Sequence, residues 1–249
     1  MTAAAAQGPV TAAILVIGDE ILSGRTKDKN IGYIADYLTA IGIDLREVRI
    51  VPDVEEEIVA AVNALRARYD YLFTTGGIGP THDDITADSV AKAFGVGIGE
   101  DPRAIAMLLE RIKPEDLNEA RRRMARIPHG AELVANPVSK APGFRIGNVI
   151  VMAGVPAIMQ AMLDEVAPTL NTGRRMLSAT IRADAKEGDI AAPLKAIADA
   201  HPDVSIGSYP FSEDGRFNTN IVVRSRDAAR LETVRAAVAE MVTRLHATP

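Results

Sequence analysis

Segments typical of buried strands alternate with segments typical of helices along the first 170 residues of the chain. Residues 12–18 are a continuous apolar run, residues 69–75 and 148–154 are similar, and residues 43–51 alternate between apolar and polar. The predicted helices are residues 30–42, 53–69, 84–95, 104–112, 114–127 and 156–170. Strands joined by helices form parallel sheets with right-handed crossovers. The expected fold class is therefore α/β, with a doubly wound, mostly parallel sheet.

The order of predicted elements changes after residues 171–175, "NTGRR", which are the best candidate for a linker. A strand, a helix, two strands joined by an Asp-Gly turn and a final helix follow, at residues 176–184, 189–202, 204–211, 217–226 and 228–245. This order is typical of a small α+β domain. We expect a flexible start over residues 1–11, an α/β domain over 12–172 and an α+β domain over 173–249.

A glycine-rich stretch, "TTGGIGPTHDDIT" at residues 74–86, directly follows one of the apolar runs. Glycines at the carboxyl end of a parallel strand allow a sharp turn whose N–H groups point into the crevice there. The positive N-terminus of the next helix points into the same crevice, which makes it an anion site. We expect Gly76, Gly77, Gly79 and Thr81 to contact the ligand. The lysine of the Walker pattern is missing here, and the dinucleotide fingerprint is absent from the sequence.

Two adjacent carboxylates, Asp83 and Asp84, would repel a bare phosphate at this turn. They fit a phosphate site if a hard divalent cation such as Mg²⁺ bridges carboxylate and phosphate. The alternative is that Asp84 only caps the helix that follows it. Asp53 stands at the end of another predicted strand and has the same two interpretations.

Further polar and turn residues fall at the ends of the other predicted strands. Gly18, Asp19 and Glu20 end the first strand, and Gly154 and Pro156 follow the last strand of the α/β domain. Ligands of open α/β sheets bind where the carboxyl ends of the strands meet, so these residues are expected to contact the ligand too.

Composition and charge restrict the class of partner. A net charge of −5 argues against a general nucleic-acid binder. The absence of cysteine excludes disulfides, thiolate catalysis and thiolate metal sites, and fits a cytoplasmic protein. The sequence has no apolar run of about 20 residues, the length that spans a membrane. We expect a cytoplasmic protein that binds a small phosphorylated ligand, with no nucleic-acid or membrane partner, as a homo-oligomer of two or three copies.

Two other features of the sequence bear on ligand binding. The run "EARRRMAR" at residues 119–126 could clamp phosphates, but consecutive arginines spread around a helix, so a solvated face is expected for most of them. Phe211 and Phe217 flank the Asp-Gly turn and are expected to pack under the helices of the small domain, which leaves its strands without aromatic rings for stacking bases.

The segments "GDEILSGRTKDKN", "VPDVEEEI", "TTGGIGPTHDDITADSVA", "ARIPHGAELVANPVSKAPGF" and "AGVPAIMQAM" resemble, in order and spacing, the molybdopterin-binding (MoaB/Mog-like) domain family. They are most similar to the version at the N-terminus of competence/damage-inducible protein A (CinA). The resemblance covers about residues 12–170. In CinA a deamidase domain usually follows, and deamidase activity is not expected for this chain.

The resemblance implies two chemistries, both of them attacks at a phosphoanhydride phosphorus. Mog-type relatives adenylylate molybdopterin with Mg-ATP, and CinA-type relatives are linked to hydrolysis of ADP-ribose-like pyrophosphates. By similarity, Asp84 and Asp53 are the catalytic residues, Asp83 joins them as a metal ligand, and Asn136 and Gly143 join the ligand contacts. Asp83 replaces an arginine that is common in Mog-type sequences, which favours the CinA-type reaction. Lys140 also departs from the usual pattern and is expected to add a cation at the site.

Phosphoanhydride cleavage with a divalent cation is therefore the expected function, and molybdopterin is a second possible ligand. A module that binds molybdopterin or a nucleotide without turnover, and Mog-type adenylylation, are the alternatives.

Overall fold

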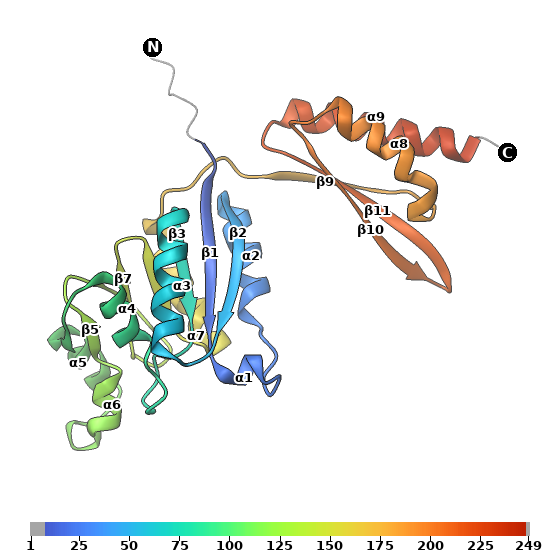
Figure 1. The fold of residues 1–249 in the computed structure, drawn as a ribbon. Helices are drawn as coiled ribbons and strands as arrows, with labels where there is room; N and C mark the ends of the chain where they lie inside the picture. The colour runs from blue at the N-terminus through green and yellow to red at the C-terminus, as the bar shows by residue number, and fades with distance from the viewer. Residues whose placement is uncertain (1–7, 248–249) are drawn as a thin grey trace, which may run out of the picture. The chain divides into compact units, whose positions relative to one another are not determined.

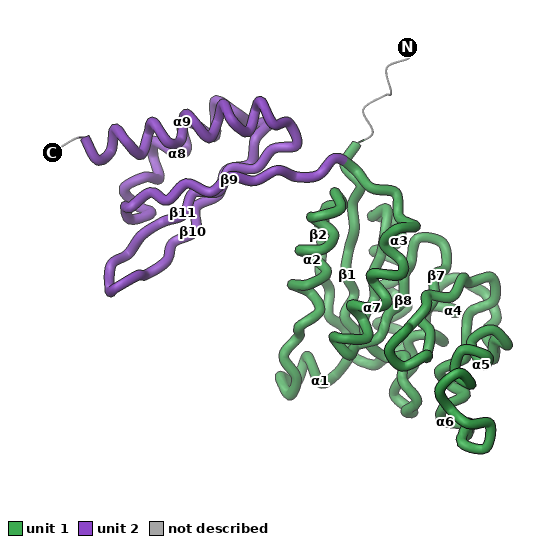
Figure 2. The backbone as a smooth tube through the Cα atoms, turned by 180° about the vertical axis from the view of Figure 1, so that it is seen from behind, with its two compact units in different colours: residues 1–173 green, residues 174–249 purple. Residues whose placement is uncertain are grey.

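A six-stranded sheet with helices on both faces forms the larger of two compact units. The computed structural model describes residues 8–247, and the chain divides between Gly173 and Arg174 (Figure 2). The strand order is β2-β1-β3-β8-β7-β6. The strands are β1 (Val10–Ile17), β2 (Ile43–Val51), β3 (Tyr71–Thr75), β6 (Glu132–Val134), β7 (Gly143–Ile146) and β8 (Val149–Met152). The first four strands in the order are parallel to one another, while β7 runs antiparallel to β8 and β6. The predicted doubly wound, mostly parallel sheet is thus confirmed.

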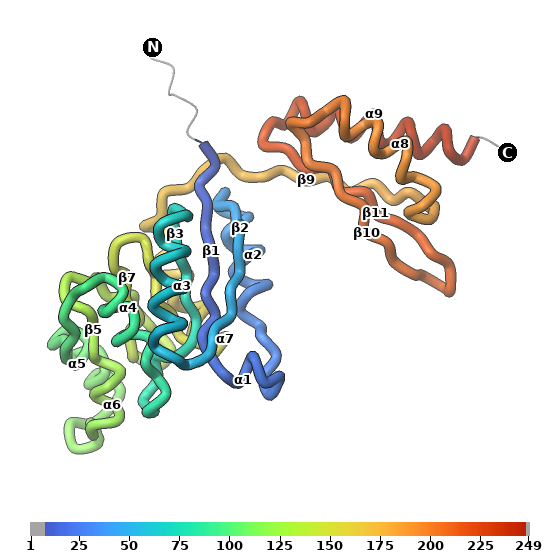
Figure 3. The backbone as a smooth tube through the Cα atoms, viewed as in Figure 1, coloured from blue at the N-terminus to red at the C-terminus, as the bar shows by residue number. Residues whose placement is uncertain are grey.

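Strand β1 is an interior strand of this sheet and lies between the edge strand β2 and β3 (Figure 3). Successive side chains of a strand point to opposite faces, and β1 is buried on both. Ala13, Leu15 and Ile17 pack in one core with α3 (Glu55–Arg68) and α4 (Thr86–Phe94). Ala12, Ile14 and Val16 pack in the other with α2 (Asn30–Ile41) and α7 (Pro156–Val166). Figure 1 shows α3 in front of the sheet and α7 behind it.

Helix ends in this unit follow the sequence signals. α2 and α4 end at Gly42 and Gly95, both in the left-handed conformation that glycine adopts readily. β1 begins at Val10, two residues before the expected start, so Val10 and Thr11 belong to the sheet and not to a flexible start. Of the rest of that expected start, residues 8 and 9 precede the strand and residues 1–7 lie outside the described residues.

The segment at 114–127 is not the single helix that was predicted. Pro114–Asp116 form a short 3-10 turn, Asn118 caps the separate five-residue helix α6 (Glu119–Arg123), and Arg126–Pro128 form strand β5. Strand β5 pairs antiparallel with β4 (Ile98–Glu100), which follows α4 and precedes α5 (Pro102–Leu109). A short α1 (Asp19–Leu22) follows β1, and a 3-10 turn, Ala167–Thr169, follows α7.

The second unit is a three-stranded antiparallel sheet with two helices. Its elements are β9 (Leu177–Arg182), α8 (Glu187–Ala200), β10 (Ser205–Glu213), β11 (Arg216–Ser225) and α9 (Ala228–Ala247), with strand order β10-β11-β9. Asp214 and Gly215 both have positive φ angles and make the tight turn between β10 and β11, as the Asp-Gly pair predicts. A separate core includes Ile221, Val223 and Val234.

One expectation for this unit is wrong. Phe217 is 71% exposed instead of packed under the helices, because the hairpin tip carries it beyond them. The Phe211 ring is partly buried and lies 5.2 Å from the guanidinium of Arg182. Arg182 in turn pairs with Asp184 and Glu213, so acidic groups offset the positive charge at this position.

Candidate active site

The glycine-rich turn after β3 is fixed by close backbone contacts. Gly76 and Gly77 have φ angles of 102° and 66°. A Cβ on Gly76 would lie 2.1 Å from the Ile17 carbonyl oxygen, and one on Gly77 would lie 2.1 Å from Thr86 Oγ1. Thr86 at the start of α4 donates from Oγ1 to the Gly76 carbonyl at 3.0 Å and from its N–H to the Gly77 carbonyl at 3.0 Å. Only glycine fits these positions, and the turn is held between β1 and α4.

Asp84 holds the far side of this turn. Its Oδ2 accepts hydrogen bonds from the Thr81 N–H at 2.8 Å and from Thr81 Oγ1 at 2.6 Å. The N-cap of α4 is Ile85, so the helix-capping alternative for Asp84 is wrong. A Cβ on Gly79 would lie 2.6 Å from Asp84 Oδ2, which shows how closely the carboxylate approaches the glycine backbone.

Asp53 is positioned in the same way at the end of β2. Its Oδ2 accepts a hydrogen bond from the Asp19 N–H at 2.9 Å, which links the start of α1 to the loop after β2. The N-cap of α3 is Val54, so Asp53 is not a helix cap either. Burial raises the pKa of Asp53, the hydrogen bond from Asp19 lowers it, and the charges of Asp19, Glu20 and Asp83 raise it. Negative charge therefore gathers around Asp53.

A cleft of about 600 Å³ opens at the carboxyl ends of these strands. Among the predicted contacts, its lining includes Glu20, Gly76, Gly77, Gly79, Asp84, Asn136, Gly154 and Pro156. The predicted residues outside this lining are Gly18, Asp19, Asp53, Thr81, Asp83 and Gly143. Thr26, Met124, Ser139, Val155 and Ile158, among others, also line it and were not predicted. The mixed polar and apolar lining and the volume suit a small molecule.

Two predicted contacts have structural roles at either end of the loop between β6 and β7. Asn136 is buried, and its side chain accepts from the Val138 and Ser139 N–H groups and donates to the Ala141 carbonyl. Asn136 thus shapes the loop that lines the cleft. A Cβ on Gly143 would lie 2.2 Å from the Val151 carbonyl, so this glycine is required by the packing of β7 on β8. Lys140 pairs with Glu110 at 2.6 Å and is outside the cleft lining, so it does not supply the expected cation.

The loop after β8 packs directly on the glycine-rich turn. A Cβ on Gly154 would lie 3.2 Å from the Gly76 Cα atom. Asn30 at the start of α2 is 4% exposed and donates from Nδ2 to the Gly154 carbonyl at 2.8 Å. Asn30 was not predicted to be part of the site, although it is the polar first residue of the predicted helix at 30–42.

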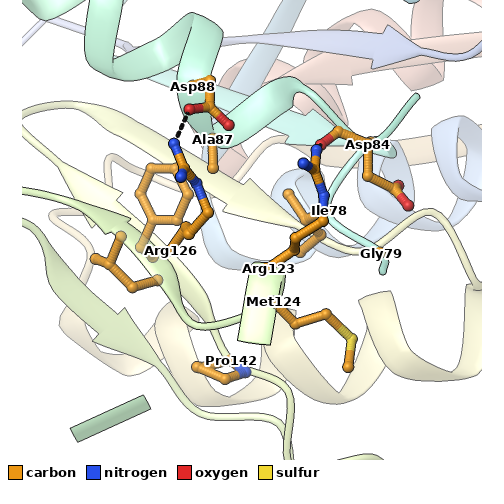
Figure 4. A pocket seen from close by; sticks show the side chains of 12 residues that line it. Ile78, Gly79, Asp84, Ala87, Asp88, Arg123, Met124, Arg126 and Pro142 are labelled. Carbon is orange, nitrogen blue, oxygen red and sulfur yellow. Dashed lines mark hydrogen bonds and ion pairs between the residues drawn. The ribbon is translucent and has the colours of Figure 1, made fainter. Parts of the chain in front are cut away.

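A second, much smaller space of about 20 Å³ lies beside the same turn, and Figure 4 shows its lining. Gly77, Ile78 and Asp84 line both spaces. Arg123 and Arg126 reach the small space from α6 and β5, and Arg126 forms an ion pair with Asp88 of α4. These two arginines come from the run that was expected to be mostly a solvated face.

The described residues, 8–247, contain no group of three or more His, Cys, Asp or Glu side chains that could hold a metal ion alone. A divalent cation would need ligand phosphate oxygens and water as well, which is the usual mode of Mg²⁺. The oxygen donors of Asp53 and Asp84 and the acidic surroundings of Asp53 fit such a hard cation. Within the same residues, no helix is long and apolar enough to cross a membrane.

Comparison with known proteins agrees with this division of the chain. Residues 13–172 match the family described as "Probable molybdopterin binding domain", and residues 175–248 match "FAD synthase, middle domain". A protein of Archaeoglobus fulgidus is 34% identical over 197 residues, which cover 79% of this chain and 84% of that protein.

Two similar proteins carry informative names. A "Probable FAD synthase" of Caenorhabditis briggsae is 30% identical over 93% of this chain, which spans about half (49%) of its length. The crystal structure of CinA, a protein of unknown function from Thermoplasma acidophilum, superimposes with a TM-score of 0.61 at 35% identity, over 64% of this chain and 96% of that one. On these matches, the chain belongs to the molybdopterin-binding (MoaB/Mog-like) domain family, near the N-terminal part of CinA.

Proposed function

We propose that the larger unit binds a phosphorylated nucleotide or pterin and cleaves a phosphoanhydride with the help of a divalent cation. The observation that carries the proposal is the placement of Asp53 and Asp84. Asp53 accepts from the Asp19 N–H at the start of α1, Asp84 accepts from the Thr81 N–H in the loop after β3, and neither carboxylate caps the helix that follows it. Carboxylates fixed in this way beside a glycine-rich turn suit a phosphate ligand that arrives with a cation.

The turn provides the phosphate contacts. The backbone between Gly76 and Thr81 faces the cleft, and α4 and α7 begin beside it, so their N-terminal partial positive charges favour an anion there. Asp53 and Asp84 would hold the cation. When bound, a divalent cation supplies neutralisation of phosphate charge and activation of a water molecule. The crowded negative charge around Asp53 is relieved by the same binding.

For ADP-ribose the reaction is a hydrolysis. A water oxygen forms a bond to one phosphorus, the bond between that phosphorus and the bridging oxygen breaks, and the bridging oxygen leaves with the other phosphate. The products are AMP and ribose 5-phosphate, and the water proton passes to solvent.

The test is incubation of the full chain with ADP-ribose and Mg²⁺, Mn²⁺ or Co²⁺, with the products separated by chromatography. We expect AMP and ribose 5-phosphate in equal amounts, and loss of both when the cation is chelated. ADP-ribose that binds but stays intact with all three cations would favour a binding module without turnover.

FAD is a second candidate substrate. The matches to the FAD synthase middle domain and to a probable FAD synthase support it, since FAD contains the same pyrophosphate link as ADP-ribose. Cleavage would give FMN and AMP, which the same chromatography detects. Molybdopterin adenylylation is less favoured, because Asp83 adds negative charge where Mog-type sequences often have an arginine.

A further inference from the structure

The charges around the glycine-rich turn are unbalanced for a phosphate ligand. Asp53, Asp83 and Asp84 lie on or next to it, and the turn lacks the lysine that completes a Walker-type phosphate site. Glu20 and Asp84 are the charged residues of the cleft lining, and both are acidic. A cation of the protein that offsets these carboxylates therefore has to reach the turn from outside the cleft.

Arg123 and Arg126 are the basic residues that line the small space behind the turn. Arg126 is neutralised by its ion pair with Asp88. Among the described residues, Arg123 has no carboxylate partner. Its Nη2 donates to the Asp84 carbonyl at 3.3 Å, and its buried Nε has no hydrogen-bond partner within the described part of the chain. A half-buried guanidinium without a counter-charge thus lies against the glycine-rich turn.

The direction of the side chains separates the charge of Arg123 from that of Asp84. In Figure 4 the Arg123 guanidinium lies beside Ile78 and the main chain of Asp84, while the Asp84 carboxylate points away from it. The small space, at about 20 Å³, has room for about one water molecule and not for a phosphate. Arg123 therefore acts on a ligand through the turn and not by direct contact.

We propose that Arg123 is a positioning residue that supplies, from behind the turn, the positive charge of the phosphate site. Its hydrogen bond fixes the main chain at Asp84, and its charge acts across the thin glycine backbone, where partial burial limits screening by solvent. This inference rests on the proposed function, because it assumes that the ligand is a phosphoanhydride. Arg123 would then be a source of positive charge that is independent of the divalent cation.

The test measures binding of inorganic pyrophosphate to the full chain by calorimetry, without a metal and with Mg²⁺. Arg123→Met removes the charge and the hydrogen bond, Arg123→Gln removes the charge and keeps a donor, and Arg123→Lys keeps the charge. Arg122→Met is the matched control, since Arg122 is the adjacent residue on α6 and pairs with Glu100. We expect the Met and Gln variants to bind about tenfold more weakly in the absence of metal. The Lys variant should recover most of the affinity, and Arg122→Met should bind as the wild type does.

Three results would overturn the inference. Equal pyrophosphate affinity in wild type and Arg123→Met shows that the residue is irrelevant to the anion. Wild-type affinity in Arg123→Gln shows that the hydrogen bond, and not the charge, matters. If Arg122→Met weakens pyrophosphate binding equally, the effect comes from the net charge of the protein and not from the position of Arg123. If pyrophosphate binding follows the expected pattern while ADP-ribose and FAD stay intact, the proposed reaction fails and the role of Arg123 stands.

Discussion

Replacing Asp84 by Asn separates its role in the turn from a role in the reaction. The Asn side chain keeps the size and one oxygen, so it can still accept from the Thr81 N–H and Oγ1. What is lost is the negative charge. Hydrogen bonds to a charged acceptor are worth about 1.5–3 kcal/mol and neutral ones about 0.5–1.5 kcal/mol, so with partial exposure we expect a stability cost of about 1 kcal/mol. For a domain of this size that lowers Tm by about 2–4 °C.

The effect on catalysis should be larger than the effect on folding. Losing a charge directed at the cation should lower kcat/KM for ADP-ribose at least about tenfold, or ~1.4 kcal/mol in the barrier. The assay compares initial rates and thermal unfolding of the wild type, Asp84→Asn and Asp101→Asn. Asp101 accepts a hydrogen bond from the Arg103 N–H at the start of α5 and pairs with the Arg103 guanidinium, away from the cleft, so Asp101→Asn should lower Tm and leave the rate unchanged. Full activity in Asp84→Asn together with a lower Tm would show that Asp84 only organises the turn.

Three further predictions concern the pH response, the glycine-rich turn and the division of the chain. The pKa of Asp53 is raised in the folded state, so between the unfolded and folded pKa values the native chain binds more protons than the unfolded chain. The free energy of unfolding therefore falls as the pH rises from the unfolded pKa through the folded pKa. Asp53→Asn should therefore be more stable than wild type at neutral pH by chemical denaturation, with no such gain below the unfolded pKa; an equal difference at both pH values would contradict the burial argument. Gly76→Ala should lower the free energy of unfolding by about 2 kcal/mol more than Gly95→Ala does. Both glycines have positive φ, but only at Gly76 would the new Cβ lie 2.1 Å from a carbonyl oxygen; equal losses of stability would show that this contact has no effect. Residues 1–173 should fold alone with native-like circular dichroism and a cooperative transition, because both cores of the sheet are complete within them, whereas a molten fragment would show that the tail is required.

The long buried strands were predictable from sequence because their residues have to be apolar on both faces. β1 and β3 are read directly from "AAILVI" and "YLFTT", and all four parallel strands were identified. Strands β4, β5, β6 and β7 were not, since three or four residues are too few to show a period of two. The break at Asn118 could have been found, because an Asn followed by Glu is an N-cap signal inside the segment that was assigned to one helix.

The candidate site was predictable where its residues directly follow strands. Asp53, Asp84 and the glycines all follow strands. The carboxyl ends of parallel strands meet at one edge of the sheet, so the sheet topology brings these residues together. Arg123 was not predictable, because three consecutive arginines do not reveal which of them faces the turn, and the segment that places it is irregular. The family resemblance implied Asn136 and Gly143 as ligand contacts. Asn136 both lines the cleft and shapes its loop, whereas Gly143 is required by strand packing.

The most direct test of the account is cleavage of ADP-ribose by the full chain, followed by phosphorus NMR with each divalent cation. We expect the pyrophosphate signals to disappear and two phosphomonoester signals to replace them. We further expect this conversion to be at least about tenfold slower in Asp53→Asn and Asp84→Asn, while both variants keep a cooperative thermal transition. Intact pyrophosphate signals for ADP-ribose and for FAD in the wild type, under conditions in which both ligands bind, would contradict the claim that this cleft cleaves phosphoanhydrides.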